Sequence, residues 1–185
     1  MENLLQGLNV FLIGMMGSGK TTVGRAIAHQ LQYRFFDTDD LIQRVTQKSI
    51  NDIFAEEGEV TFRALESKVL TELAACTKSA IATGGGIVLD RLNWGHLHQG
   101  LIVWLDAPVE LLAQRLAEDN TRPLLKEADL ASKLTSLLEQ RQHLYAQADI
   151  RIQIDATQTP EEIATEIIQK IPTVLKQKTV PPSNN

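Results

Sequence analysis

The 185-residue sequence contains one cysteine, few aromatic residues and no long hydrophobic run. Cys76 cannot form an internal disulfide and has no second thiolate for a zinc site, so we expect a buried or half-buried thiol and a cytoplasmic location. The apolar stretch 10–16 is far too short to span a bilayer. Residues 1–12 include Glu2 and no basic residue, and we therefore expect neither a secretory signal nor a transit peptide.

The sequence also lacks an excess of positive charge. Lysine and arginine total 18 against 23 aspartate and glutamate residues, a net charge of -5, and the basic residues are scattered. This distribution argues against nucleic acid or an anionic membrane as the main partner. With 43% hydrophobic residues, the chain can bury one substantial core. We expect a monomer with a single domain, residues 1–171, and a flexible tail without apolar periodicity, residues 172–185.

Segments rich in apolar and β-branched residues alternate with segments of helical periodicity. This alternation is typical of a parallel sheet covered by helices on both faces. The sequence predicts five strands, at 8–13, 34–37, 80–83, 101–105 and 150–154. The predicted helices span 21–31, 39–46, 50–55, 57–75, 108–118, 127–148 and 160–169.

A glycine-rich motif directly follows the first predicted strand. Residues 14–21 read G-M-M-G-S-G-K-T, which fits the pattern G-x-x-x-x-G-K-[ST], and a helical pattern comes next. Glycines let successive backbone N–H groups and the positive end of the helix face phosphate oxygens. Lys20 can then reach the β and γ phosphates, and the hydroxyl of Thr21 can ligate Mg²⁺. A glycine-rich turn formed by chance is the alternative, but the flanking strand and helix favour a nucleoside triphosphate site.

Two aspartates follow the second predicted strand. Asp37 and Asp39 share one face if the chain there is extended, while Asp40 points away or caps the next helix. Two carboxylates beside a phosphate loop can hold a hydrated Mg²⁺ and accept a hydrogen bond from an acceptor hydroxyl. Taken alone, the pattern D-x-D is also typical of a solvated helix cap.

An aromatic pair and an arginine come next in the chain. Phe54 and Phe62 lie on either side of Gly58 and can form an apolar wall beside the guanidinium of Arg63, as a carbocyclic acid would require. The alternative is a phenylalanine pair in the core with a surface Arg–Glu pair on a helix, in a segment that holds Glu59 and Glu66 besides Arg63.

Two later segments complete the pattern. Gly84, Gly85 and Gly86 follow the third predicted strand and let backbone approach a ligand closely, unless they form a plain loop. Arg122 lies in the sequence T-R-P-L-L among acidic residues, and Arg141 precedes the dipeptide L-Y. A flexible arginine loop can close over a triphosphate and exclude water. Read alone, both are ordinary surface arginines.

In this order and at this spacing, these motifs resemble the shikimate kinase family from about residue 8 to residue 160. The resemblance implies an α/β P-loop fold of the nucleoside-monophosphate-kinase type, with a five-stranded parallel sheet flanked by helices. It implies a mobile lid at about 120–128 and a substrate-binding segment at about 39–63. It also implies an enzyme of aromatic amino acid biosynthesis that uses ATP and Mg²⁺ to phosphorylate the 3-hydroxyl of shikimate.

The resemblance further implies roles for individual residues. The implied ATP site consists of Gly17, Ser18, Gly19, Lys20, Thr21, Thr22, Arg115, Arg122 and Gln158. The implied shikimate site consists of Asp39, Phe54, Phe62, Arg63, Gly84, Gly85, Gly86 and Arg141. Thr21 and Asp37 are the implied metal residues, and Lys20, Asp39 and Arg122 the implied catalytic residues. In the family pattern the two substrate arginines grip the carboxylate, and Arg115 packs on adenine with Gln158 nearby.

Two positions depart from the family pattern. Gln47 stands where a glycine is usual and His143 where a proline is usual, so the geometry of two turns is in doubt. Two other functions stay open: a different small-molecule or nucleotide kinase on the same scaffold, and a catalytically silent nucleotide-binding protein. The pair Arg63 and Arg141 suits a small cyclic acid better than a nucleotide, and every proposed catalytic position is filled.

Overall fold

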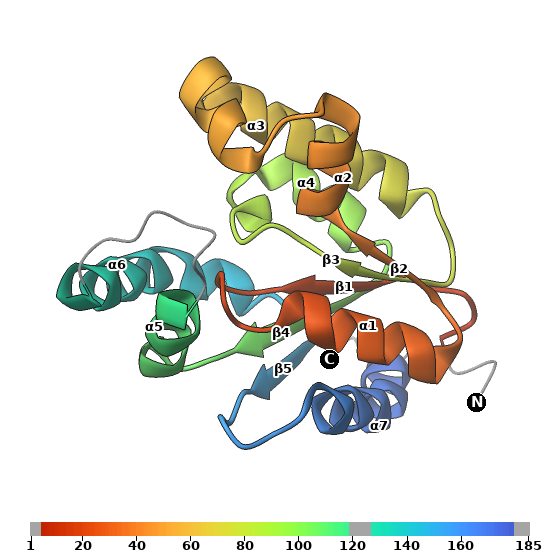
Figure 1. Ribbon diagram of the computed structural model, residues 1–185. Coiled ribbons are helices and arrows are strands. Elements are labelled where there is room, and N and C mark those ends of the chain that lie inside the picture. The colour runs from red at the N-terminus through yellow and green to blue at the C-terminus, as the bar shows by residue number, and fades with distance from the viewer. Residues whose placement is uncertain (1–4, 119–126, 180–185) are drawn as a thin grey trace, which may run out of the picture.

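The computed structural model describes residues 5–118 and 127–179 (Figure 1). The five strands are β1 (Val10–Ile13), β2 (Arg34–Asp37), β3 (Ser79–Ala82), β4 (Leu101–Asp106) and β5 (Ile150–Gln153). The helices are α1 (Lys20–Leu31), α2 (Thr38–Thr46), α3 (Ile50–Ala74), the short 3₁₀ helix η1 (Ile87–Leu89), α4 (Arg91–Leu97), α5 (Val109–Glu118), α6 (Glu127–Tyr145) and α7 (Pro160–Thr179). All strand pairs are parallel, in the order β2-β3-β1-β4-β5. The predicted five-stranded parallel α/β fold is therefore confirmed.

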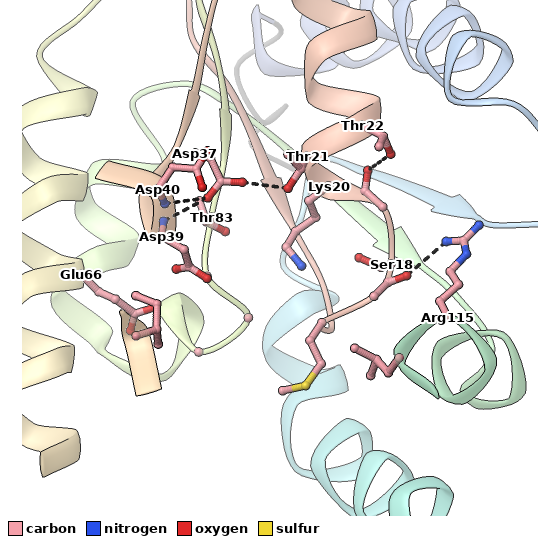
Figure 2. Close-up of a pocket in the computed structure, with 18 of the residues that line it drawn as sticks. Ser18, Lys20, Thr21, Thr22, Asp37, Asp39, Asp40, Glu66, Thr83 and Arg115 are labelled. Atoms are coloured by element: carbon pink, nitrogen blue, oxygen red, sulfur yellow. Dashed lines mark hydrogen bonds between the residues drawn. The ribbon is translucent and has the colours of Figure 1, made fainter. Parts of the chain in front are cut away.

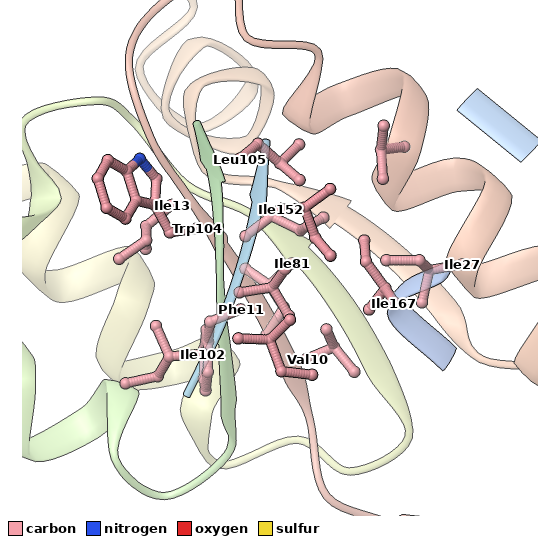
Figure 3. Close-up of a cluster of buried hydrophobic side chains, with 14 of the residues drawn as sticks. Val10, Phe11, Ile13, Ile27, Ile81, Ile102, Trp104, Leu105, Ile152 and Ile167 are labelled. Carbon is pink, nitrogen blue, oxygen red and sulfur yellow. The ribbon is translucent and has the colours of Figure 1, made fainter. Parts of the chain in front are cut away.

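The central strands are buried because helices cover both faces of the sheet. Every residue of β1 and β3 is buried, which explains why these strands read as continuous apolar runs without alternation. Figure 3 shows Ile13 and Trp104 on one side of the sheet, and Ile27 of α1 with Ile167 of α7 on the other. Ile13 and Trp104 are partners in the β1–β4 register, so the two side chains share a face. Each fully buried side chain of this size contributes about 1.5–3 kcal/mol.

The strand order decides where the functional loops meet. β1 lies between β3 and β4, and β2 pairs with the outer side of β3. The loops that follow β1, β2 and β3 therefore leave the same edge of the sheet next to one another. In parallel α/β sheets, the carboxyl ends of the strands around such a reversal of order form the usual ligand crevice.

Helix α3 consists of two helical pieces joined at a glycine. Ser49 caps its first turn, accepting a hydrogen bond from the backbone N–H of Asp52, whose carboxylate in turn accepts one from the N–H of Ser49. Gly58 has φ 81° and ψ 170°, which breaks the regular helix. The sequence predicted two helices with a break at residue 56, and the break lies two residues further on.

The C-terminal helix is longer than the sequence predicted. We expected a flexible tail from residue 172, but α7 continues to Thr179 with Pro172 inside it. The helix continues because Ile171 is fully buried, and Val174 and Leu175 pack against the core one turn later. Their burial offsets the cost of about 3 kcal/mol for a proline within a helix. Neither α7 nor any other helix in the described part of the chain is long and apolar enough to cross a membrane.

Two short helices that the sequence did not predict, η1 and α4, connect β3 to β4. Asp90 caps α4 by accepting a hydrogen bond from the N–H of Leu92. Two buried side chains of α4 then donate to carbonyls of η1: Asn93 to Ile87 at 2.9 Å, and Trp94 to Val88 at 3.0 Å. Because η1 contains three residues and α4 seven, neither is long enough to show a helical periodicity in the sequence.

We expect Asn9→Ala to lower the free energy of unfolding by about 2–3 kcal/mol, because several buried polar groups would lose their partner. The Asn9 amide donates to the Cys76 carbonyl at 2.8 Å and accepts from the Ser79 N–H at 3.1 Å, which fixes β1 relative to β3. Urea unfolding measures the change. The exposed Asn51→Ala is the matched control, and an equal loss in both variants would contradict the structural role of Asn9.

Candidate active site

A cleft of about 1010 Å³ lies along the carboxyl ends of β1, β2 and β3. One end, the phosphate-loop end, is formed by residues 16–23 with Arg115 and Gln158. The other, the arginine end, is formed by the aromatic pair, Arg63, the glycine triplet (residues 84–86) and Arg141, with Asp39 between the ends. All the predicted site residues line this cleft except Arg122, which lies outside the described residues. Figure 2 shows Lys20 and Thr21 facing Asp37 and Asp39 across it.

The phosphate loop connects β1 to the first turn of α1. Gly19 precedes the helix in a left-handed conformation, with φ 94° and ψ 17°, so the loop ends with backbone N–H groups facing outward. The ammonium group of Lys20 donates to the carbonyls of Gly14 and Met15, both at 2.8 Å. Ser18 is buried within the loop. The loop thus presents a cation and helix N–H groups at one place, which suits a chain of phosphates.

Two residues predicted at the adenine lie beside this loop. Arg115 of α5 donates to the Gly17 carbonyl at 3.1 Å. Gln158, in the turn before α7, accepts a hydrogen bond from the N–H of Asp155 at 3.2 Å. The structure brings both side chains to the phosphate-loop end, although Arg115 lies 98 positions from Gly17 in the sequence. Their contact with adenine stays a prediction.

Asp37 links the loop to helix α2. One carboxylate oxygen accepts hydrogen bonds from the N–H groups of Asp39 and Asp40, at 3.0 and 3.4 Å, and so caps α2. The other accepts from the hydroxyl of Thr21 at 2.7 Å (Figure 2). The prediction that Asp37 and Asp39 share a strand face was wrong, because Asp37 ends β2 and Asp39 lies in the first helical turn. The prediction that Asp40 points away or forms a cap was also wrong: Asp37 is the cap, and Asp40 lines the cleft.

The oxygens of Thr21 and Asp37 suit Mg²⁺, which prefers oxygen ligands and keeps several waters when it binds together with phosphates. No group of three or more metal-binding side chains occurs within residues 5–118 and 127–179.

The arginine end combines an aromatic wall with ion pairs. The rings of Phe54 and Phe62 lie 4.6 Å apart, Phe62 is buried, and the Arg63 guanidinium lies 5.3 Å from the Phe62 ring. Arg63 pairs with the exposed Glu59 at 3.1 Å and, more closely, with the buried Glu66. The two interpretations of this segment are thus both partly right. The phenylalanines do pack together, but Arg63 faces the cleft and one of its partners is buried.

Glu66 also lines the cleft, although the sequence predicted no role for it. It is 1% exposed, and its Oε1 atom has no hydrogen-bond partner in the described part of the structure. A side chain at Gly84 would collide with Oε1 of Glu66 and would approach Oδ1 of Asp39 to 3.0 Å. Burial raises the pKa of Glu66, and the nearby Asp39 adds to this, while Arg63 and Arg141 oppose it. Its i, i+3 spacing from Arg63 was the available signal.

The glycine triplet holds the arginine end together. A side chain at Gly86 would collide with the Arg63 guanidinium, so that residue must be glycine for Arg63 to occupy its place. Arg141 donates to the carbonyl of Gly85 at 3.4 Å, and the Tyr145 hydroxyl donates to the same carbonyl at 2.7 Å. Two guanidinium groups, from α3 and α6, therefore reach the same short stretch of backbone.

A phosphate loop at the end of a central parallel strand, facing a second pocket with two arginines, defines a small P-loop kinase. The sequence matches the shikimate kinase family model over residues 16–172, and the chain belongs to this family. It is 60% identical to a shikimate kinase of Rippkaea orientalis over 96% of this chain and 95% of that protein. It is 62% identical to that of Nostoc punctiforme, covering 95% and 97% of the two chains. A structure of shikimate kinase from Acinetobacter baumannii in complex with shikimate is similar with a TM-score of 0.85, at 38% identity, and covers 96% of this chain and 98% of its own.

We expect the pH dependence of stability to identify the buried carboxylate. The folded-state pKa of Glu66 is raised, so the protonated carboxyl contributes to the free energy of unfolding. This contribution is fully present below the ordinary pKa of 4.5, and it is lost as the pH rises through the folded-state pKa. The stability of the natural protein relative to Glu66→Gln should therefore fall as pH rises across that window, measured by urea unfolding. Glu59→Gln, which removes the exposed partner of the same arginine, is the control for the loss of an ion pair with Arg63. A flat difference for Glu66→Gln would contradict the raised pKa.

Proposed function

We propose that this chain transfers the γ-phosphoryl group of ATP to the 3-hydroxyl of shikimate. The observation that carries the proposal is the juxtaposition, in one cleft, of a phosphate loop with a pocket where Arg63 and Arg141 converge beside two phenylalanines. Shikimate has a carboxylate, an apolar ring face and hydroxyl groups, and each has a complementary group in this pocket. The similar Acinetobacter baumannii protein was solved in complex with shikimate, which supports the choice of acceptor.

At the phosphate-loop end, the N–H groups of the loop and Lys20 bind the phosphates, and the other loop residues with Arg115 and Gln158 surround the rest of the nucleotide. Lys20 would exchange its present partners, two loop carbonyls, for β- and γ-phosphate oxygens. Thr21 and Asp37 would hold Mg²⁺, which would stabilise negative charge on the phosphates when bound.

At the arginine end, Arg63 and Arg141 bind the carboxylate and thereby orient the ring. Phe54 and Phe62 cover one apolar face, and the glycine triplet lets the substrate lie close to backbone. This orientation presents a hydroxyl to Asp39, which accepts its hydrogen bond and takes up the proton as the phosphoryl group is transferred in line. Because such transition states are loose, the position of the hydroxyl contributes more than the basicity of Asp39.

Several predictions from the sequence rest on the resemblance alone. Arg122 is proposed to close over the transferring phosphoryl group as part of the lid. Arg122 and most of the predicted lid lie outside the described residues. That the enzyme works as a monomer in the cytoplasm also stays a prediction. Between the two rival functions, the filled site argues against a silent binding protein, and the paired arginines beside an aromatic wall argue against a nucleotide acceptor.

Shikimate-dependent ADP formation in a coupled assay tests the proposal directly. We expect turnover with shikimate, and a loss of about 10²-fold or more in Lys20→Met, since the methionine keeps the stem but removes the charge that faces the developing negative charge. Circular dichroism establishes that the variant is folded. No turnover of shikimate by the natural protein would exclude the activity, and more than about a tenth of normal turnover in Lys20→Met would remove Lys20 from the mechanism.

Arg63→Ala and Arg141→Ala should each raise the KM for shikimate by about 10- to 100-fold, because each removes a charge-assisted hydrogen bond worth roughly 1.5–3 kcal/mol. The dissociation constant for ADP should change little. An analogue with a neutral amide in place of the carboxylate is the control, since it should lose much less affinity than the acid on Arg63→Ala. If acid and amide lose equal affinity, the carboxylate is not what Arg63 binds.

A further inference from the structure

The backbone of the glycine triplet has to be held by other parts of the chain. It lines the arginine end of the cleft, with the Asp39 and Glu66 carboxylates at Gly84 and the Arg63 guanidinium at Gly86. Glycines have no side chains with which to fix their own position and lose the most conformational freedom on folding. A shift of this backbone would displace the charged groups that orient the acceptor.

Hydroxyl groups from three elements hold this segment. The hydroxyl of Thr83 donates to the Leu12 carbonyl of β1 at 2.8 Å. The hydroxyl of Thr38 in α2 accepts from the N–H of Gly84 at 2.9 Å. The hydroxyl of Tyr145 in α6 donates to the Gly85 carbonyl at 2.7 Å. Thr38 and Tyr145 are both 0% exposed, so no water can replace either hydroxyl without opening the fold.

The two helical hydroxyls lie beside the proposed substrate residues. Thr38 directly precedes Asp39 in the first turn of α2. Tyr145 is one helical turn after Arg141, on the same face of α6, and the two side chains share the Gly85 carbonyl as acceptor. Each hydroxyl therefore ties one proposed substrate residue to the same short stretch of backbone.

We propose that Thr38 and Tyr145 are positioning residues that clamp the glycine triplet between α2 and α6 and thereby set the distance between Asp39 and Arg141. Neither side chain is among those that line the cleft, so both act through the residues that do. Burial raises the pKa of Tyr145, which keeps its hydroxyl protonated as a donor to Gly85. The proposal rests on shikimate being the acceptor, and it assigns these two hydroxyls to acceptor binding and not to nucleotide binding.

Removal of the two hydroxyls tests the clamp. Tyr145→Phe keeps the ring, which stacks on Trp104 with centroids 5.8 Å apart, and removes only the donor. We expect the KM for shikimate to rise about three- to tenfold, the size of one neutral hydrogen bond, while the KM for ATP stays within about twofold. Thr38→Val should raise the KM for shikimate in the same way, and Thr38→Ser, which keeps the hydroxyl, should restore it.

The other tyrosine provides a matched control. Tyr33→Phe removes a partly buried hydroxyl that does not line the cleft, and it should leave both KM values unchanged. If Tyr145→Phe lowers stability in urea but leaves the KM for shikimate within about twofold, the hydroxyl is only structural and the clamp is refuted. Tyr145→Phe decides the question even if Thr38→Val does not fold. A natural protein that does not turn over shikimate would refute the proposed function instead, before any variant is compared.

Discussion

The close approach of charged side chains to the glycine triplet is the constraint on which the rest of the site depends. Carboxylates from α2 and α3 and guanidinium groups from α3 and α6 meet over residues 84–86, where a Cβ atom would collide with Glu66 at Gly84 and with Arg63 at Gly86. The absence of side chains at Gly84 and Gly86 makes room for these two charged groups. The carboxyl ends of the parallel strands β1, β2 and β3 lie next to one another at this edge of the sheet. Helices α2, α3 and α6 carry the charged side chains.

Burial makes these charges sensitive to their neighbours. Removing an ion from water costs several kcal/mol unless partners compensate, so Glu66 at 1% exposure depends on its contact with Arg63, and its burial raises its pKa. In return, Glu66 holds the Arg63 guanidinium toward the cleft, whereas the exposed Glu59 alone would leave it free to move in solvent. The electrostatic arrangement therefore exists before an acceptor binds, which lowers the cost of orienting one.

A single carboxylate joins the two ends of the cleft. Asp37 caps α2 through one oxygen and contacts Thr21 through the other, so the first turn of α2, with Asp39, has a fixed relation to the phosphate loop. A metal bound to Asp37 and Thr21 would act on a group that also sets the start of α2, the first part of the proposed substrate-binding segment. The geometry thus gives nucleotide and acceptor a direct structural connection.

The sequence by itself determined the features that depend on neighbouring residues. The spacing of G-x-x-x-x-G-K-T between a buried strand and an amphipathic helix predicted the phosphate loop, and apolar runs alternating with helical periodicity predicted the five parallel strands. The residues predicted for the site line one cleft in the described chain, because the family pattern preserves their order and spacing even where they lie on different elements; their roles stay predictions.

Only the tertiary structure decided how these residues work together. It made Asp37 the helix cap, buried Glu66 against Arg63, and brought Tyr145 to the carbonyl of Gly85, 60 positions away. It also extended α7 past Pro172, because Val174 and Leu175 pack against the hydrophobic core. The local sequence does not show that the core lies there. Side-chain burial and hydrogen bonds between distant segments depend on the packing of the whole chain, and a linear sequence records only which residues are available to make them.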